Sequence, residues 1–299
     1  MTRATNHARP QHRQVHRRRR AQTQSQESPE NRSKRLEVSV EGTQPQPAGA
    51  TAGYLPQKSD VVRDLFDRIA ARYDRANTAM TGGMDELWRR AAIGQLHVAD
   101  DARLLDLCCG TGALARAMAR KVPEGCVDAI DFSPKMLDIA RAHAGPRNID
   151  WHQADVLSLP FEDATFDGAA MAFSMRNIVD IGACLREVAR VLKPGASFVN
   201  LEIGKPPNAL WRRMFYFYFY NVLPVIGGAA GGDAAAYRYL PQSLVSFPDA
   251  DALAALFQAN KFAHVRYVRL AGGILTMHIG TTDRAPNGHS TSAIKDLLA

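Results

Sequence analysis

Cysteine is scarce in this chain of 299 residues, and its four copies are Cys108, Cys109, Cys126 and Cys184. No Cys-x-x-Cys or Cys/His spacing links them, so the sequence predicts no metal site. Two adjacent cysteines after an apolar run fit small packing side chains better than a redox pair. The chain also lacks the apolar core of a secretory signal, so we expect reduced thiols and a cytoplasmic protein.

The first 50 residues have almost no large apolar side chains and are rich in Gln, Ser, Pro and Thr. They hold ten Lys and Arg against four Glu, which leaves 27 basic and 26 acidic residues over 51–299. Such a segment cannot bury enough surface to order itself, so we predict a disordered basic tail over 1–55. Two interpretations of this segment stay open. Arg17 to Arg20 contact nucleic acid or an anionic membrane, or the segment is an extension without function. The nearly neutral remainder predicts no nucleic-acid partner for the folded domain.

From residue 60 onward, helical and extended patterns alternate. A helical apolar face predicts a helix over Asp60–Asp74. Further strands are predicted at about 103–109, 127–132, 149–155, 166–174 and 197–203, with helices near 112–121, 134–144 and 180–192. This order predicts a doubly wound α/β sheet in a domain over 56–285, followed by a flexible C-terminal tail over 286–299.

Two β-rich runs near the C-terminus, His264–Ala271 and Ile274–Thr281, are joined by Gly272 and Gly273. This spacing favours a tight antiparallel hairpin. A Rossmann-like, mostly parallel sheet that ends in such a hairpin is typical of class I methyltransferases that use S-adenosylmethionine (SAM).

The run from Leu104 to Gly112 predicts a nucleotide-binding turn. An apolar strand containing Asp106 leads to Gly110 and Gly112, which let a ligand approach the main chain, and a helix begins at Ala113. The same glycines, with Asp131 placed 19 residues after Gly112, also satisfy the spacing of a dinucleotide-binding turn. The turn alone therefore leaves SAM and NAD open.

Acidic residues at the ends of three predicted strands favour SAM. Asp106, Asp131 and Asp155 each follow an apolar run, and parallel strands bring their carboxyl ends to one edge of a sheet. A pyrophosphate is anionic and prefers bare N–H groups or bases. The sulfonium and ammonium of SAM prefer nearby carboxylates.

A segment at about 206–248 interrupts the α/β pattern. It includes the aromatic run Phe215–Tyr220, and Pro224 and several glycines argue against a membrane span, as does its place between two strands of one sheet. We predict an apolar insertion that walls a groove for a prenyl chain and rests on the membrane surface. An internal aromatic cluster is the alternative.

Several motifs resemble the ubiquinone/menaquinone biosynthesis C-methyltransferases over about residues 60–282. The more specific ones are Met175–Asp180 and Tyr237–Leu240. The others are Phe66–Asp74, Asp106–Gly112, Asp131–Leu137, Leu159–Phe161, Phe166–Asp167, Arg190–Gly195, Leu201–Pro206 and Ala271–Ile274. The chain departs from the family pattern at Ala172, where a serine is usual, and at Ser174 and Met175, where Gly-Leu is usual.

The resemblance implies a SAM site and no metal. It places Thr111, with Asp106, Gly110 and Gly112, in the cofactor turn and Asp131 on the ribose hydroxyls. Asp155 and Val156 would lie beside the adenine, with Phe132 over the ring.

The implied reaction is methylation of a ring carbon of a prenylated hydroquinol, either demethylmenaquinol or a ubiquinol precursor. Arg176 is the candidate cation that favours the phenolate, and Asn177 the residue that fixes a second oxygen. Tyr73 is the candidate lid residue near the substrate. The alternative for Arg176 is an ion pair with Asp180, and the alternative for Tyr73 is ordinary helix termination.

Other functions stay open from the sequence. Within methyltransferases the alternative is another phenolic or lipid small molecule, including O-methylation. An NAD-dependent reductase and a SAM-binding protein without activity are the alternatives from other classes. Two further interactions stay open: peripheral contact of the insertion with the membrane, and formation of a homodimer.

Overall fold

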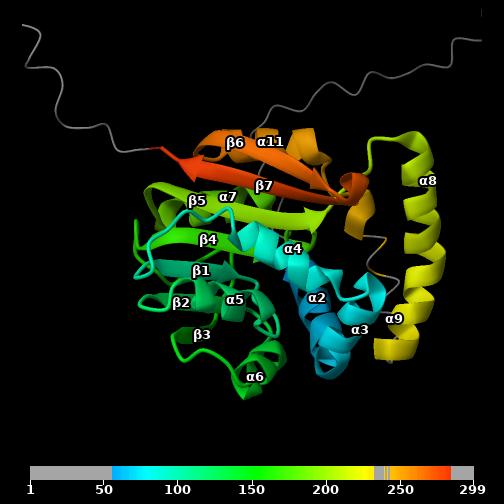
Figure 1. The fold of residues 1–299 in the computed structure, drawn as a ribbon, viewed down its shortest axis with the longest axis horizontal. Helices are drawn as coiled ribbons and strands as arrows, with labels where there is room; N and C mark the ends of the chain where they lie inside the picture. Colours follow the sequence, from blue (N-terminus) through cyan, green and yellow to red (C-terminus); the bar gives the residue numbers. More distant parts are fainter. Residues whose placement is uncertain (1–55, 232–238, 240, 242, 284–299) are drawn as a thin grey trace, which may run out of the picture. The chain divides into compact units, whose positions relative to one another are not determined.

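The computed structural model describes residues 56–231, 239, 241 and 243–283. The predicted tails over 1–55 and 286–299 lie outside the described residues, as does part of the insertion between 232 and 242. The domain that contains the described residues is built on one sheet (Figure 1).

The sheet has seven strands among the described residues, in the order β3-β2-β1-β4-β5-β7-β6. Their bounds are β1 Arg103–Leu107, β2 Cys126–Asp131, β3 Ile149–Gln153, β4 Phe166–Ala172, β5 Leu192–Ile203, β6 Phe262–Leu270 and β7 Leu275–Thr282. β1 to β5 pair in parallel, and β7 lies antiparallel between β5 and β6. The predicted doubly wound sheet with a C-terminal antiparallel hairpin is confirmed, and strand order reverses beside β1, where such sheets bind ligands.

Alternation along β1 builds two cores, one on each face of the sheet. Leu104 packs with α4 (Met84–Ile93) and α5 (Ala113–Lys121), whereas its neighbour Leu105 packs with α7 (Ile181–Val191) and α11 (Ala250–Ala259). All four β1 residues from Leu104 onward are buried because helices cover both faces. α6 (Pro134–Ala142) covers β2 and β3.

The predicted helix over Asp60–Asp74 is three elements instead. α2 (Pro56–Ile69) is followed by the 3₁₀ turn η1 (Ala70–Arg72) and by α3 (Tyr73–Thr81), which ends at Gly82 in the left-handed conformation, with φ 61°. Tyr73 therefore begins a helix, and the interpretation of Tyr73 as a helix terminus is wrong. These helices lie beyond the carboxyl ends of the parallel strands (Figure 1).

The insertion is a continuous helical run: α8 (Ala209–Phe217), the π-helix η3 (Tyr218–Val222) and α9 (Leu223–Gly231). Phe215, Phe219 and Leu223 point inward and are buried, and the Tyr218 hydroxyl donates to the carbonyl of Met80 at 2.8 Å. The run thus forms an internal aromatic cluster on one side and packs against α3. Over the part of the chain that the structure describes, no helix combines the length and apolar character needed to cross a membrane.

Candidate active site

The turn after β1 has the conformation that its glycines predict. Gly110 and Gly112 have φ of 55° and 81°, and Gly112 is the N-cap of α5. A side chain at Gly112 would lie 2.4 Å from the Trp151 ring, so close packing excludes any larger residue there. A Cβ at Gly110 would meet no atom within 4 Å, which leaves open space beside the main chain for a ligand.

The carboxylate of Asp131 links this turn to the next one. Its Oδ2 accepts from the Gly110 N–H at 2.8 Å, and its Oδ1 accepts from the Ser133 N–H at 2.9 Å. Burial raises the pKa of Asp131 from 3.8 to about 6, against the opposing effect of these backbone hydrogen bonds. Asp131 therefore holds both turns, and its protonation state changes near pH 6.

Asp106 is buried at the end of β1 without a hydrogen-bond partner among the described residues. Burial raises the pKa of this carboxyl well above its usual range. A buried, unpartnered carboxyl beside an open cavity is a place where a cationic ligand group gains an ion pair. The ammonium of SAM fits this requirement, and a pyrophosphate does not.

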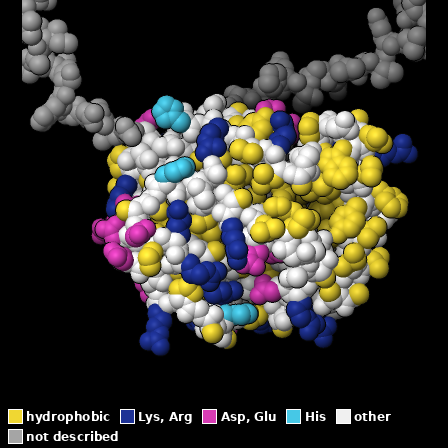
Figure 2. Space-filling model, viewed as in Figure 1, with side chains coloured by type: hydrophobic (Ala, Val, Ile, Leu, Met, Phe, Trp, Pro, Cys, Tyr) yellow, Lys and Arg dark blue, Asp and Glu magenta, His cyan; other side chains and the backbone are white. Residues whose placement is uncertain are grey.

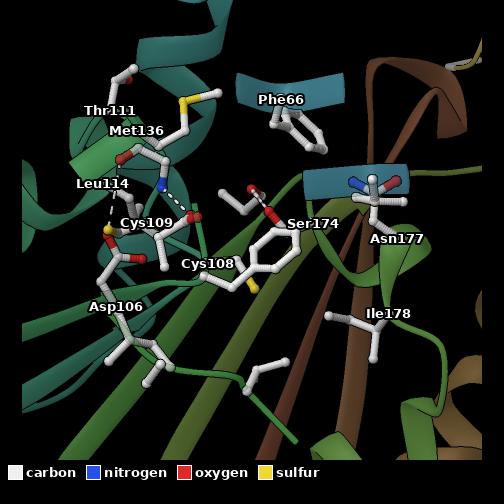
Figure 3. Close-up of a pocket in the computed structure, with 18 of the residues that line it drawn as sticks. Phe66, Asp106, Cys108, Cys109, Thr111, Leu114, Met136, Ser174, Asn177 and Ile178 are labelled. Atoms are coloured by element: carbon white, nitrogen blue, oxygen red, sulfur yellow. Dashed lines mark hydrogen bonds between the residues drawn. The ribbon is translucent and has the colours of Figure 1, made fainter. Parts of the chain in front are cut away.

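A first cavity lies at the carboxyl ends of β1, β2 and β4 (Figure 3). Nine of the residues predicted from the sequence line it: Tyr73, Asp106, Gly110, Thr111, Asp131, Phe132, Asp155, Val156 and Asn177. Gly112 does not line the cavity, because it packs against Trp151. Ser174 lines it as well, so a hydroxyl is present two residues beyond Ala172, where the family serine is missing.

The N-terminal helices are bonded across this cavity by two side-chain contacts. Thr111 Oγ1 donates to Asp74 at 2.7 Å, and Ser133 Oγ donates to Asp67 at 2.5 Å. Tyr73 contacts Phe66 edge-on, with ring centroids 5.9 Å apart. The hydroxyls of Thr111 and Ser133 therefore hold α3 and α2 in place as a wall of the cavity.

A second cavity of about 310 Å³ adjoins the first. The two share Phe66, Tyr73 and Arg89 as lining residues. Most other residues of the second cavity are apolar, and they come from α2, α3, α4, the insertion, and the ends of strands β4, β5 and β7. Arg176 lines the second cavity and Asn177 the first, so these neighbours in sequence face different cavities.

Arg176 is paired with Glu202 on β5, and the predicted alternative of a bond to Asp180 is wrong. Its Nη1 lies 2.6 Å from Glu202 Oε1 and 2.5 Å from the Phe173 carbonyl, with both charged side chains buried. Asp180 instead caps α7 by accepting from the Ala183 N–H at 2.8 Å. Arg176 Nε is left without a partner among the described residues.

Three charged residues at the second cavity escaped prediction from the sequence. Asp85 and Arg89 lie on α4, a helix that was not predicted from the sequence, and they form an ion pair. Glu202 falls within the motif Leu201–Pro206, but nothing in the sequence indicates that it pairs with Arg176, 26 positions away. Only tertiary structure brings these residues to the site.

The ubiE/COQ5 methyltransferase family model matches residues 55–282. The chain belongs to this family. It is 40% identical over 230 residues to a demethylmenaquinone methyltransferase of Deinococcus radiodurans, covering 76% of this chain and 95% of that protein. It is 37% identical over 233 residues to a ubiquinone/menaquinone biosynthesis C-methyltransferase of Geotalea daltonii, covering 76% and 98%.

Among solved structures, the fold resembles a SAM-dependent methyltransferase of Thermotoga maritima. The TM-score is 0.53 at 17% identity, over 73% of this chain and 98% of that one. Membership of the ubiE/COQ5 methyltransferase family decides between SAM and NAD in favour of SAM, and the unpartnered carboxyl of Asp106 agrees with that choice. The protein is a SAM-dependent methyltransferase with a class I fold.

We expect Asp131 to make cofactor binding depend on pH. The pKa of Asp131 in the folded protein, about 6, exceeds the ordinary 3.8, so protonation of Asp131 stabilises the unliganded fold. This contribution to the free energy of unfolding is lost as the pH rises through 6. Accepting ribose hydroxyls needs the carboxylate, which gives the opposite dependence. The dissociation constant for S-adenosylhomocysteine, measured by calorimetry, should rise about tenfold between pH 7 and pH 5.

The Asp131→Asn variant should bind more weakly at pH 7 and lose this pH dependence. Asp150→Asn, at an exposed position of the neighbouring strand β3, is the matched control and should keep both properties. Equal affinity of the unaltered protein at pH 5 and pH 7 would contradict the assignment.

Removing one partner of the Arg176–Glu202 pair should destabilise the fold, whereas replacing both partners with apolar residues should change stability little. Glu202→Leu leaves a buried guanidinium without its counterion, and we expect the free energy of unfolding to fall by about 3 to 5 kcal/mol in urea titrations. Arg176→Met combined with Glu202→Leu should recover most of that loss because no buried charge remains. Glu86→Ala, which breaks the exposed pair with Arg90 on α4, should change stability by less than about 1 kcal/mol. A double variant as unstable as Glu202→Leu alone would rule out this account.

Proposed function

We propose that the protein transfers the methyl group of SAM to a ring carbon of a prenylated hydroquinol in quinone biosynthesis. The observation that carries the proposal is the apolar second cavity, which adjoins the first through Phe66, Tyr73 and Arg89. An acceptor with a polar ring and an apolar chain fits a cavity of this composition. The names of the relatives from Deinococcus radiodurans and Geotalea daltonii support the same substrate class.

Unpartnered polar atoms at the cavities support an acceptor that carries hydroxyl groups. Arg176 Nε and the Tyr239 hydroxyl belong to residues of the second cavity, and Asn177 Oδ1 belongs to one of the first. None of these buried atoms has a hydrogen-bond partner among the described residues. Buried donors and acceptors without partners are costly, and the two oxygens of a hydroquinol would satisfy them.

SAM supplies an electrophilic methyl group, and the chain must make a ring carbon nucleophilic. A phenol titrates near 10, and a cation about 4 Å away lowers that pKa by roughly three units at an effective dielectric of 20. Glu202 offsets the charge of Arg176, so Arg176 would act mainly as a rigid hydrogen-bond donor. Tyr73, which lines both cavities, would hold the ring at their junction.

The proposal is tested by an anaerobic assay of the full chain with SAM and three acceptors: demethylmenaquinol, a demethylated ubiquinol precursor and a simple phenol. We expect one of the quinols to gain a methyl group on carbon, identified by product mass and NMR, with a rate well above that of the phenol. O-methylation of the phenol without turnover of either quinol would favour the other phenolic acceptors. SAM binding without any product would identify an inactive SAM-binding protein.

We also propose that the outer side of the insertion rests on the membrane surface. Leu210, Met214, Phe217 and Val225 are between 55% and 71% exposed, whereas Phe215 and its inward neighbours wall the second cavity. Hydrophobic side chains gather on the side of the molecule where α8 and α9 lie (Figure 2). A prenyl chain in the bilayer would then lie next to the helices that wall its cavity.

Flotation with liposomes tests this contact. The unaltered protein should float with vesicles, and Leu210→Glu with Phe217→Glu should reduce the bound fraction at least about tenfold, since each exposed apolar side chain contributes about 1.5 to 3 kcal/mol on burial. Val268→Glu, at an exposed position of β6, is the control and should bind normally. Methylation of a short-chain, water-soluble quinol should be unchanged in all three proteins. Loss of that activity, or flotation of the double variant, would contradict the proposal.

A further inference from the structure

Asp85 is the one carboxylate among the described residues that line the second cavity. The other ionisable side chains of that lining are Arg89, Arg176 and three tyrosines. Glu202, which lies behind Arg176, does not line the cavity, and its Oε1 already accepts from Arg176 and from the Ile203 N–H. Asp85 is therefore the acidic group that an acceptor in this cavity would meet.

The backbone places Asp85 at the start of a helix, where a carboxylate is favoured. Gly82 and Gly83 both have positive φ, 61° and 78°, and α4 begins directly after them. Asp85 lies in the first turn of α4, where the helix dipole favours a negative charge. Its side chain is only 15% exposed, so a ligand in the cavity would replace most of its remaining water.

Two contacts fix the carboxylate and still leave it able to accept a further hydrogen bond. Asp85 Oδ2 is paired with Arg89 Nη1, and Thr81 Oγ1 lies 3.0 Å from Asp85 Oδ1. The same hydroxyl lies 2.8 Å from the Asn77 carbonyl, and its single hydrogen serves one acceptor at a time. Asp85 Oδ1 can therefore take a proton donor from the cavity.

Arg89 is fixed in turn at the junction of the two cavities. Its guanidinium lies over the Phe173 ring, 5.3 Å from the centroid, and it lines both cavities. Phe173 has a φ of 62°, an unfavourable conformation for a non-glycine residue that places its ring at this point. The Asp85–Arg89 pair is thus a rigid polar feature at the end of the second cavity nearest the first.

We infer that Asp85 accepts the proton of the acceptor hydroxyl adjacent to the methylated carbon. This inference rests on the proposed function. The O–H bond breaks, its proton moves to Asp85 Oδ1, and the electron pair of the oxygen is delocalised onto the adjacent ring carbon. That carbon bonds to the methyl group as the methyl–sulfur bond breaks, and the electron pair of that bond stays on sulfur.

The remaining steps balance the reaction. The hydrogen on the methylated carbon leaves as a proton to the ring oxygen, which restores the aromatic ring and the hydroxyl. Asp85 releases its own proton to water. A carboxyl group is far more acidic than a phenol, so the transfer to Asp85 accompanies formation of the carbon–carbon bond and does not precede it.

Asp85→Asn tests the inference because it keeps the size of the side chain and removes its basicity. We expect kcat with the quinol at pH 7 to fall by about 10²- to 10⁴-fold, with S-adenosylhomocysteine affinity nearly unchanged. Thermal stability should also fall, because Arg89 loses its counterion. Glu86→Gln, one residue further on the exposed side of α4, should retain full activity.

A series of ring-fluorinated acceptors with falling hydroxyl pKa separates a base from a structural role. The deficit of Asp85→Asn should shrink as the acceptor becomes more acidic, because a preformed phenolate needs no base. A deficit that is constant across the series, or a kcat within threefold of the unaltered protein, would overturn the inference.

The unaltered protein distinguishes this outcome from failure of the proposed function. If it methylates no quinol but does methylate another phenol, the proposed function fails and the same series is run with that phenol. If it methylates no hydroxylated acceptor at all, both proposals are overturned.

Discussion

The carboxylate of Asp131 is the contact on which the site depends. It accepts from the N–H groups of Gly110 and Ser133, so one side chain sets the turn after β1 and the turn after β2. Through these turns it also places Thr111 and Ser133, whose hydroxyls hold the N-terminal helices at Asp74 and Asp67. A buried carboxylate in this position is costly, as its pKa of about 6 indicates, and the hydrogen bonds that it accepts offset part of that cost.

The same arrangement explains why the protein has two cavities side by side. The sheet and its turns form one wall of the first cavity, and α2 and α3 form the other. Because α3 also packs on α9, the insertion extends this second wall outward and encloses the apolar cavity. Phe66 and Tyr73 therefore lie between the cavity that the three strand-end carboxylates line and a more apolar cavity, an arrangement that suits the methyl transfer to a prenylated acceptor proposed above.

Local patterns predicted the elements of the sheet and most of the residues that line the first cavity. Asp106 and Asp131 lie at the carboxyl ends of β1 and β2, and Asp155 follows β3, so the parallel order of the strands brings the three carboxylates to one edge. The acceptor side depends on contacts between distant segments. The alternative to a catalytic role for Arg176 was a pair with Asp180, its nearest carboxylate in sequence, but Asp180 caps α7 and Glu202 from the next strand pairs with Arg176. No periodicity in the sequence distinguishes these two outcomes.

The charges of the second cavity cancel in pairs, and this cancellation matters for an uncharged acceptor. Arg176 is balanced by Glu202, and Arg89 by Asp85. An unpaired cation there would be costly in the free protein, since it would lie in an apolar cavity without a counterion. A paired site would bind the neutral hydroquinol proposed as acceptor without that cost and would still present both a donor and an acceptor to its hydroxyls. When negative charge develops on the ring oxygen, the two fixed guanidinium groups are already oriented, and so they stabilise the transition state more than the ground state.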